Sequence, residues 1–219
     1  MLHTLRYGDD AMVVDVLTES RGCVTFLVRI PKTRKAPAQS LLLRPLAVFQ
    51  LELDYRANRQ MQRVRNLSVD SPYVSIPYEP TKNAVALFLA EVLYYALRRE
   101  ETPNVTLFAF LEQSLRWFDL AESHFVNFHV VFLIKLTRYL GFWPTEEELT
   151  HDGLLTPLDA EWVDRLLRFN YQTMRVLQMT REQRNRLLDI ICSYYTRHVA
   201  DFPEVRSLGV LREMFQPSS

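Results

Sequence analysis

The chain has 219 residues, 48% of them hydrophobic and 24% charged, which is enough to bury a core and predicts a folded, soluble protein. A membrane-spanning protein is excluded because the best candidate run, residues 125–142, contains Lys135 and Arg138. The formal net charge is zero, but residues 1–69 carry 11 basic and 6 acidic side chains, whereas residues 70–219 carry 15 and 20.

The charge split coincides with a split in sequence pattern. The basic part alternates polar and apolar residues as β-strands do, and the acidic part repeats apolar residues at helical spacing. A small basic β module on a larger helical body suggests recognition of a polyanion, most commonly nucleic acid. A mild basic excess is also typical of an ordinary solvated surface, and charge alone does not decide between the two.

The amino terminus and the cysteine content indicate the compartment. Met-Leu-His-Thr-Leu-Arg lacks the apolar stretch of a signal peptide, and Cys23 and Cys192 are too few for a disulfide framework. We therefore expect a reducing, cytoplasmic setting.

Two β-hairpins are predicted in the basic part. Residues 11–17 and 23–30 are rich in β-branched side chains and flank a short polar turn, and residues 46–53 and 60–69 alternate on either side of a polar break. The segment between the hairpins, residues 31–40, combines prolines with cations and lacks periodicity, which predicts an exposed, mobile loop. Five or so short antiparallel strands in this space suggest a small barrel.

Helices are predicted throughout the acidic part. Residues 71–80 form a proline-rich linker, and Pro80 suits a first helical position. Asn104 is a predicted helix cap, Thr180 and Gln183 form a capping box, and the third helix is apolar nearly all round and belongs in the centre of a bundle. The expected helices span residues 81–100, 104–119, 124–141, 159–179, 180–198 and 207–215.

Signatures of catalysis are absent from the sequence. The chain has no Gly-rich nucleotide motif and no nucleophile elbow, which argues against nucleotide-dependent catalysis. His124 and His129 fall on different faces of one predicted helix, so we interpret them as ordinary core or surface histidines. A magnesium-dependent nuclease would need clustered carboxylates, and the run Glu146-Glu147-Glu148 is interpreted as a solvated loop.

The basic residues are the main candidate for a binding site. Nine cations lie within 37 positions and aromatic residues lie among the strands, a combination that suits single-stranded nucleic acid. The alternative is that the aromatic side chains (Tyr7, Phe26, Phe49 and Tyr55) form the barrel core and the cations solubilise its edges. We favour the core for the aromatic residues and a function for the loop cations. The nine cations of the whole cluster are Arg29, Lys32, Arg34, Lys35, Arg44, Arg56, Arg59, Arg63 and Arg65.

Several stretches of the chain resemble the RecO family of bacterial recombination mediators, in the form found in Bacteroides-like bacteria. They cover most of the chain and occur in the family's order. The stretches are HTLRYGDDAMVVDVLTESRGCVTFLVRI, SIPYEPTKNAVALFLAEVLYYALRREE, FAFLEQSLRWFD, NFHVVFLIKLTRYLGFWP and DFPEVRSLGVLREMF.

The resemblance implies an α+β multidomain fold: an OB-fold β-barrel over residues 1–70, followed by an all-α helical domain over residues 71–219. It also implies a non-enzymatic, nucleoid-associated protein that binds single- and double-stranded DNA and anneals complementary strands. With RecR, such proteins help RecA displace single-strand binding protein (SSB) in gap repair. The DNA contacts that we predict from the resemblance are Arg6, Arg29, Lys32, Arg34, Lys35, Arg44, Arg56 and Arg59.

RecO-like proteins also receive the acidic carboxy-terminal tail of SSB on the helical domain, and residues 132–140 match that region in broad pattern. An acidic peptide that ends in an aromatic residue and a free carboxylate needs a hydrophobic socket and one or two cations. The resemblance thus assigns Phe132, Lys135, Arg138 and Tyr139 to the tail. The alternative is that both cations extend from a buried helix to solvent.

Two departures from the family pattern have consequences. Many members carry a four-cysteine zinc site after the stretch matching GFWP, whereas residues 144–175 contain no cysteine, so neither zinc nor another cofactor is expected. The chain also begins where the family's first strand is already under way, which predicts a frayed barrel edge. A competing hypothesis is a protein-interaction scaffold whose barrel binds DNA only incidentally.

Overall fold

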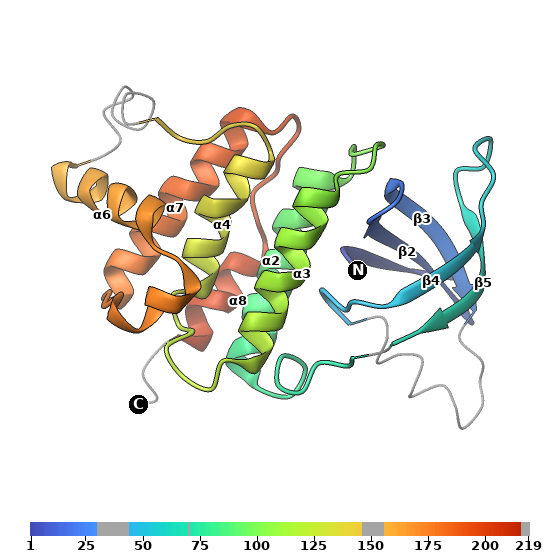
Figure 1. Ribbon diagram of the computed structural model, residues 1–219, viewed down its shortest axis with the longest axis horizontal. Coiled ribbons are helices and arrows are strands. Elements are labelled where there is room, and N and C mark those ends of the chain that lie inside the picture. Colours follow the sequence, from blue (N-terminus) through green and yellow to red (C-terminus); the bar gives the residue numbers. More distant parts are fainter. Residues whose placement is uncertain (30–43, 70, 146–155, 216–219) are drawn as a thin grey trace. The chain divides into compact units, whose positions relative to one another are not determined.

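A computed structural model gives the structure of the protein and describes residues 1–29, 44–69, 71–145 and 156–215 (Figure 1). The chain divides into two compact units, residues 1–119 and residues 120–219, and we describe each by itself. The first unit thus contains two helices as well as the sheet. The domain boundary predicted at residue 70 separates strands from helices instead, and it stays a prediction. None of the helices in the described ranges is long and apolar enough to cross a membrane.

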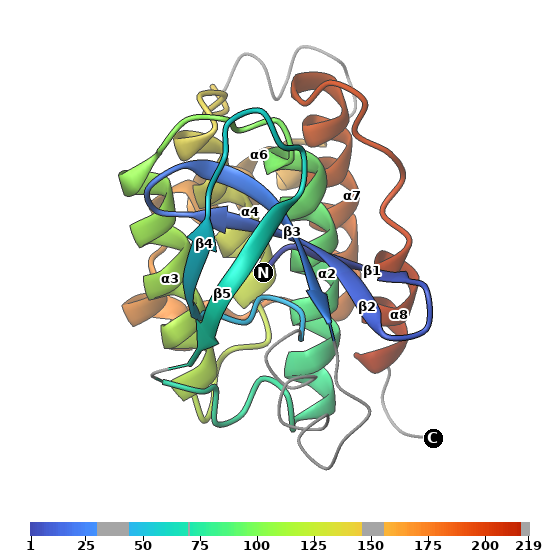
Figure 2. The same cartoon turned by 90° about the vertical axis from the view of Figure 1, so that its right-hand side faces the viewer.

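The first unit is built on a five-stranded sheet in the order β1-β2-β3-β5-β4. All neighbouring strands are antiparallel except β3 and β5, which are parallel, and Figure 2 shows that the sheet is strongly curved. Among the described residues the sheet is not closed, since β1 and β4 are its edges. This confirms the five-stranded OB fold that the resemblance implies, but the expectation of antiparallel strands throughout was wrong for the parallel pair β3 and β5. The strands are β1 (His3–Tyr7), β2 (Ala11–Thr18), β3 (Gly22–Arg29), β4 (Gln50–Asp54) and β5 (Gln62–Ser68).

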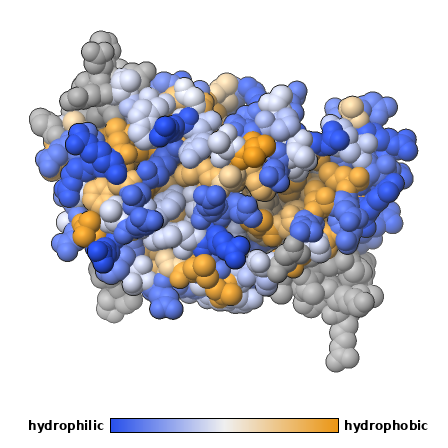
Figure 3. Space-filling model, in the orientation of Figure 1, coloured by the Kyte–Doolittle hydropathy of each residue, from blue (hydrophilic) through white to orange (hydrophobic). Residues whose placement is uncertain are grey.

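Alternating side chains of β2 and β3 form the core of the sheet. Val14 lies opposite Phe26 and Val16 lies opposite Val24, and all four are buried. Half-buried residues complete the cluster, among them Phe49, whose ring meets that of Phe26 edge to face at 6.4 Å. Figure 3 shows hydrophobic side chains that reach the surface over the strands between hydrophilic ones, as expected of an open sheet.

The first predicted hairpin is confirmed by β2 and β3, and residues 60–69 form β5 as predicted. The prediction of a strand from residue 46 was wrong at its start, because β4 begins only at Gln50. Leu46 is buried with a φ of +61°, a left-handed conformation that no strand can accommodate. Its N–H donates to Met1 O at 3.1 Å and its carbonyl accepts from the Tyr73 hydroxyl at 3.0 Å, so tertiary hydrogen bonds hold this conformation.

Two helices accompany the sheet in the first unit, α2 (Pro80–Leu97) and α3 (Val105–Leu120), close to their predicted bounds. Asn104 caps α3 as predicted, since its Oδ1 accepts from the N–H of Leu107 at 3.0 Å. The carboxyl end of α2 touches the β2–β3 turn, where the N–H of Cys23 donates to Glu100 O at 2.6 Å. A Cβ on Gly22 would lie 2.4 Å from the same oxygen, and therefore only glycine fits there.

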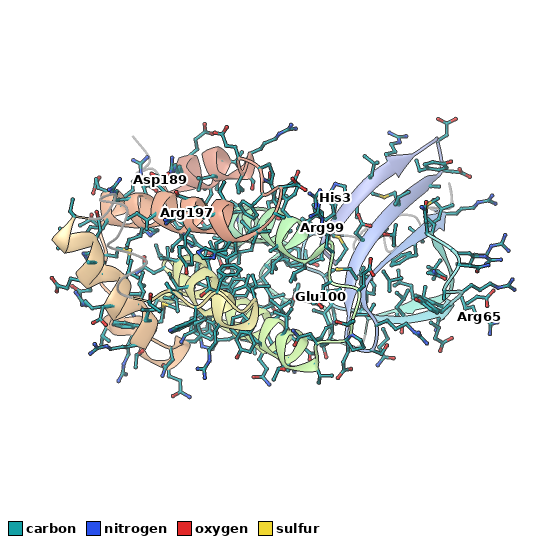
Figure 4. All side chains as sticks on the ribbon, turned by 90° about the horizontal axis from the view of Figure 1, so that it is seen from above. His3, Arg65, Arg99, Glu100, Asp189 and Arg197 are labelled. Carbon is teal, nitrogen blue, oxygen red and sulfur yellow. The ribbon has the colours of Figure 1, made fainter. Side chains whose placement is uncertain are left out.

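His3 fixes a second point of contact between the sheet and α2. Its ring stacks on that of Tyr94 with centroids 4.5 Å apart, and Figure 4 shows it beside the end of α2. Nδ1 of the same ring lies 3.3 Å from Asp15 Oδ2 on β2. Strand β2 and helix α2 together fix the position of β1, which pairs with β2 along all five of its residues.

A buried ionic network joins the linker to both helices of the first unit. Asp119, at the end of α3, accepts hydrogen bonds from three consecutive backbone N–H groups, those of Val74, Ser75 and Ile76, each at 2.9 Å. Lys82 Nζ, on α2, donates to Ser75 Oγ at 2.7 Å and to Asp119 O at 3.1 Å. Both charged side chains are almost completely buried, so the network fixes the linker backbone against α2 and α3.

The second unit is a helical bundle around α4 (Phe128–Tyr139), which is buried from Phe128 to Ile134 and again at Leu136 and Thr137. This confirms the prediction of a central, apolar helix. The predicted capping box of Thr180 and Gln183 is also confirmed at the start of α7. The other helical elements are α6 (Pro157–Arg168), a 3₁₀ helix η1 (Tyr171–Val176), α7 (Arg181–His198) and α8 (Ser207–Met214).

Two helix predictions in the second unit were wrong in their bounds. The helix expected from residue 124 begins at Phe128, because His124 has a φ of +59°, so His124 and His129 do not share a helix. The helix expected over residues 159–179 ends at Arg168, after which Asn170 caps η1 through hydrogen bonds with Thr173. The Asn170 side chain thus accepts a backbone hydrogen bond in place of continued helix formation. The helix therefore ends here, although the apolar residues continue at helical spacing.

Substituting Asp119 is expected to destabilise the first unit strongly. Asp119→Ala leaves three buried N–H groups of the linker without their acceptor, which should lower the free energy of unfolding by about 3–5 kcal/mol. Urea unfolding followed by circular dichroism measures this. Glu112→Ala, an exposed carboxylate on the same helix, is the matched control, and equal effects of both variants would contradict the role given to Asp119.

Acid is expected to destabilise the second unit through His129. Burial lowers the pKa of this imidazole to about 3, with a smaller contribution from Arg184. Between about pH 6.5 and 3 the unfolded chain binds a proton there that the folded chain does not, so the free energy of unfolding falls as the pH falls, by up to about 1.4 kcal/mol per pH unit. Urea unfolding at pH 7, 6 and 5 should show a smaller pH slope for His129→Met than for the wild type. An unchanged slope would exclude His129 as its source.

Candidate nucleic-acid interface

The β4–β5 loop presents two of the predicted DNA contacts on a backbone held by one buried side chain. Gln62 Nε2 donates to the carbonyls of Arg56 and Arg59, at 3.0 and 2.8 Å, and its Oε1 accepts from the N–H of Arg56 at 2.9 Å. Arg56 is exposed and Arg59 is half-buried. Arg59 Nη1 is buried and, among the residues that the structure describes, has no hydrogen-bond partner. The loop therefore offers cations from a preorganised backbone.

Arg6 and Arg29 lie near the same end of the sheet, in neighbouring rows whose side chains point to opposite faces. The register aligns Tyr7, Ala11 and Arg29 in one row across β1, β2 and β3, and Arg6 occupies the next row of β1. Both arginines are exposed. The neighbouring β1–β2 turn carries Asp9 and Asp10, so the potential at this end is mixed rather than uniformly positive.

The register separates these two pairs of arginines. Because β3 and β5 are parallel with Phe26 opposite Gln62, the β4–β5 loop lies at the end where β3 begins, whereas Arg29 is at the end where β3 finishes. Eight strand residues span roughly 20–25 Å. The sheet thus carries cations at both of its ends instead of a single patch.

The remaining predicted contacts have different settings. Arg44 is half-buried, and its Nη1 donates to Pro77 O at 2.9 Å, next to the ring of Tyr78. Lys32, Arg34 and Lys35 lie outside the described residues. The placement of the eight cations is thereby known for five of them, and their role as DNA contacts stays a prediction.

Two further arginines continue the basic surface along β5. Arg63 and Arg65 are exposed and alternate with inward-facing residues of that strand. Arg65 lies 3.9 Å from Asp54, and Figure 4 shows it on the side of the sheet that faces away from α2 and α3. Both belong to the cation cluster seen in the sequence, and the period-two alternation over residues 62–68 is the signal that would have placed them on the surface.

The aromatic side chains near these cations divide into two groups. Phe26 and Phe49 belong to the core, as predicted, but Tyr7 and Tyr55 are 57% and 40% exposed, so the core assignment was wrong for these two. The guanidinium carbon of Arg21 lies 4.0 Å above the centre of the Tyr55 ring. Sequence alternation alone could not separate the groups because Tyr55 lies just beyond the end of β4.

In the second unit, the residues assigned to the SSB tail are not equally accessible. Phe132 is completely buried and lies against Phe128 with ring centroids 5.6 Å apart, so in this structure it belongs to the core and offers no surface to a peptide. Lys135 is half-buried and Arg138 is exposed one helical turn later. Burial, and secondly the charge of Arg138, lowers the pKa of Lys135. Two adjacent cations that repel each other are a favourable place for a carboxylate.

An apolar residue accompanies these cations. After α4, the N–H of Phe142 donates to Thr137 O at 3.1 Å while Gly141 has a φ of +84°, so the chain turns back on the helix end. Trp143 follows this turn and is 37% exposed. Tyr139 is half-buried. The predicted end of this helix at Gly141 is confirmed, but the exposure of Trp143 after it is not readable from the sequence.

Comparison with known proteins identifies the same family for the amino-terminal and the carboxy-terminal parts of the chain. The family "Recombination protein O N terminal" matches residues 1–73, and "Recombination protein O C terminal" matches residues 77–151. The chain is 41% identical to DNA repair protein RecO of Bacteroides fragilis and 40% identical to that of Phocaeicola vulgatus, in each case over 98% of this chain and 96% of the relative. The chain belongs to the RecO family. A RecO of Flavobacterium psychrophilum, 26% identical over the same shares, shows that the likeness extends to more distant relatives.

The two cysteines of the chain do not fit the four-cysteine zinc site that the sequence comparison brought into question. In the described part of the chain, no three His, Cys, Asp or Glu side chains gather closely enough to hold a metal ion. Cys23 and Cys192 lie in different units, and burial raises the pKa of each thiol to about 12. The Cys23 thiol donates a hydrogen bond to Leu97 O. Cysteine binds zinc as a thiolate, and burial keeps these two thiols protonated at neutral pH.

We expect the protein to be insensitive to chelators. Because the buried thiols do not ionise near neutral pH, the purified protein should contain far less than one zinc per chain, and EDTA should leave its midpoint of thermal unfolding unchanged. Elemental analysis and a thermal melt measure the two quantities. Stoichiometric zinc with a lowered midpoint after chelation would show that other residues hold a structural metal.

Proposed function

We propose that this RecO family member is a recombination mediator that binds single- and double-stranded DNA, anneals complementary strands and, with RecR, helps load RecA onto SSB-coated DNA. The observation that carries the proposal is an OB sheet with exposed arginines at both ends in a chain that is 40% identical to proteins named DNA repair protein RecO. The setting is cytoplasmic and nucleoid-associated.

Phosphate neutralisation explains how such a sheet would promote annealing. Arg56 and Arg59 present guanidinium groups from the loop held by Gln62, and Arg6 and Arg29 do so at the opposite end. Arginine binds phosphate oxygens without reading the sequence, so two strands held by such contacts repel each other less and keep their base edges free to pair. No covalent bond is formed or broken in annealing, and the proposal is therefore of a binding protein rather than an enzyme.

The second unit is the proposed site for the SSB tail. Lys135 and Arg138 supply two adjacent cations for acidic side chains and a terminal carboxylate, and the exposed Trp143 supplies an apolar contact after the same helix. Tyr139 borders these residues along α4, whereas Phe132 supports them from the core. Recruitment to SSB-coated DNA would then depend on the second unit and strand pairing on the first.

Contact with protein partners has a candidate surface on β1. Leu5 and Tyr7 are 59% and 57% exposed on this edge strand of the sheet. Exposed apolar side chains on an edge strand suit a protein partner, and we assign RecR to this role. The same surface is the specific observation that favours the alternative of a protein-interaction scaffold.

Charge reversal in the β4–β5 loop is expected to weaken DNA binding specifically. Arg56→Glu with Arg59→Glu should reduce the affinity for a single-stranded oligonucleotide at least tenfold at moderate salt, and should lower the slope of log K against log salt by about 1–2. Fluorescence anisotropy measures both quantities. The fold should persist because Gln62 binds the loop through its backbone.

The control makes the same change in net charge outside the strands and the β4–β5 loop. Arg98→Glu with Arg116→Glu alters two exposed cations at the end of α2 and on α3 of the same unit and should leave affinity within about twofold of the wild type. Equal losses in the two double variants would mean that only total charge matters, which would contradict a site on the loop.

A further inference from the structure

The linker of the first unit exposes an aromatic ring. Tyr78 is 66% accessible to solvent, more than any other aromatic side chain in the described ranges, and Val74 on the same segment is equally exposed. A ring that is two-thirds in water contributes little to folding. The proline-rich sequence of this segment predicts only a linker between domains.

The backbone that carries the ring is fixed. The N–H groups of Val74, Ser75 and Ile76 are bound by the Asp119 carboxylate, and the N–H groups of Tyr78 and Glu79 both donate to Ser75 O at 2.9 Å. A turn held in this way presents its side chains without an ordering cost on binding. The exposure of Tyr78 is thus a defined feature of the fold rather than a property of a loose linker.

A cation accompanies the ring. The guanidinium carbon of Arg44 lies 5.7 Å from the centre of the Tyr78 ring, and its Nη1 is anchored to the carbonyl of the preceding residue, Pro77. A guanidinium has five N–H donors, so this one bond leaves donors for an anion. Tyr55 differs, since the guanidinium of Arg21 lies only 4.0 Å above its ring and covers one face.

We infer that Tyr78 and Arg44 form a binding site for one unpaired nucleotide, in which the ring stacks on the base and the guanidinium binds its phosphate. This inference rests on the proposed DNA binding and adds a preference to it. Every base has a flat face, so stacking of this kind is independent of sequence. In a duplex the base faces are stacked on one another, and the ring therefore selects single-stranded over double-stranded DNA.

The test compares three ligands by fluorescence anisotropy: a thymidine oligonucleotide, the same backbone with abasic positions, and a blunt duplex. Tyr78→Ala should weaken binding of the thymidine oligonucleotide about tenfold, the loss of one base–aromatic stack, and should leave abasic and duplex affinities within twofold. Tyr78→Phe, which keeps the ring, should bind like the wild type. Val74→Ala is the matched control, because it removes an equally exposed apolar side chain without a π face.

The outcomes separate the inference from the function on which it rests. Unchanged thymidine affinity in Tyr78→Ala, with DNA binding otherwise intact, would overturn the stacking site and leave this surface to a protein partner. Equal losses for all three ligands, or an equal loss in Val74→Ala, would overturn it as well. A wild-type protein that binds none of the ligands would overturn the proposed function and the stacking site together. Circular dichroism of each variant confirms that the fold is retained.

Discussion

The arrangement of the first unit depends on one buried carboxylate. Asp119 binds three consecutive N–H groups of the linker, and Lys82 from α2 closes the network through Ser75 and the carbonyl of Asp119. A carboxylate can be buried only when its acceptors are satisfied, and here the linker backbone satisfies them. The linker therefore has a single conformation, from which Tyr73 reaches Leu46 and Pro77 anchors Arg44. The positions of Arg44 and Leu46 before β4 and the entry into α2 follow from this network.

Preorganisation recurs at three candidate binding elements in the described part of the chain. Gln62 holds the β4–β5 loop as Asp119 holds the linker, because one buried polar side chain forms hydrogen bonds with several backbone groups. The side chains of the loop arginines are then not needed to fix the loop backbone. In the second unit, the buried face of α4 fixes the helix that carries Lys135 and Arg138. Strand pairing without covalent chemistry would depend on positioned cations of this kind. Counterion release supplies the affinity for DNA, and the fixed positions of the cations orient the strands.

Local signals in the sequence predicted most elements of the fold but not their arrangement. The hairpin of β2 and β3 and the capping box at Thr180 are short-range features, and both are confirmed. The start of β4 depends on Leu46, whose left-handed conformation is imposed by Met1 and Tyr73 from distant parts of the chain, and so it was missed. The site shows the same limit. The cations were visible as a cluster, but only the β3–β5 register shows that they divide between two ends of the sheet. Phe132 is buried, as the apolar pattern of its helix predicts, whereas the resemblance assigned it to the SSB tail.

We propose that this RecO family member mediates strand pairing on SSB-coated DNA. The most direct measurement is the rate at which two complementary oligonucleotides, each coated with the cognate SSB, anneal with and without the purified protein. We predict acceleration that disappears when the acidic tail of SSB is deleted and that persists at catalytic ratios without magnesium or nucleotide. Tight DNA binding without any acceleration would contradict the claim and would favour a protein-interaction scaffold.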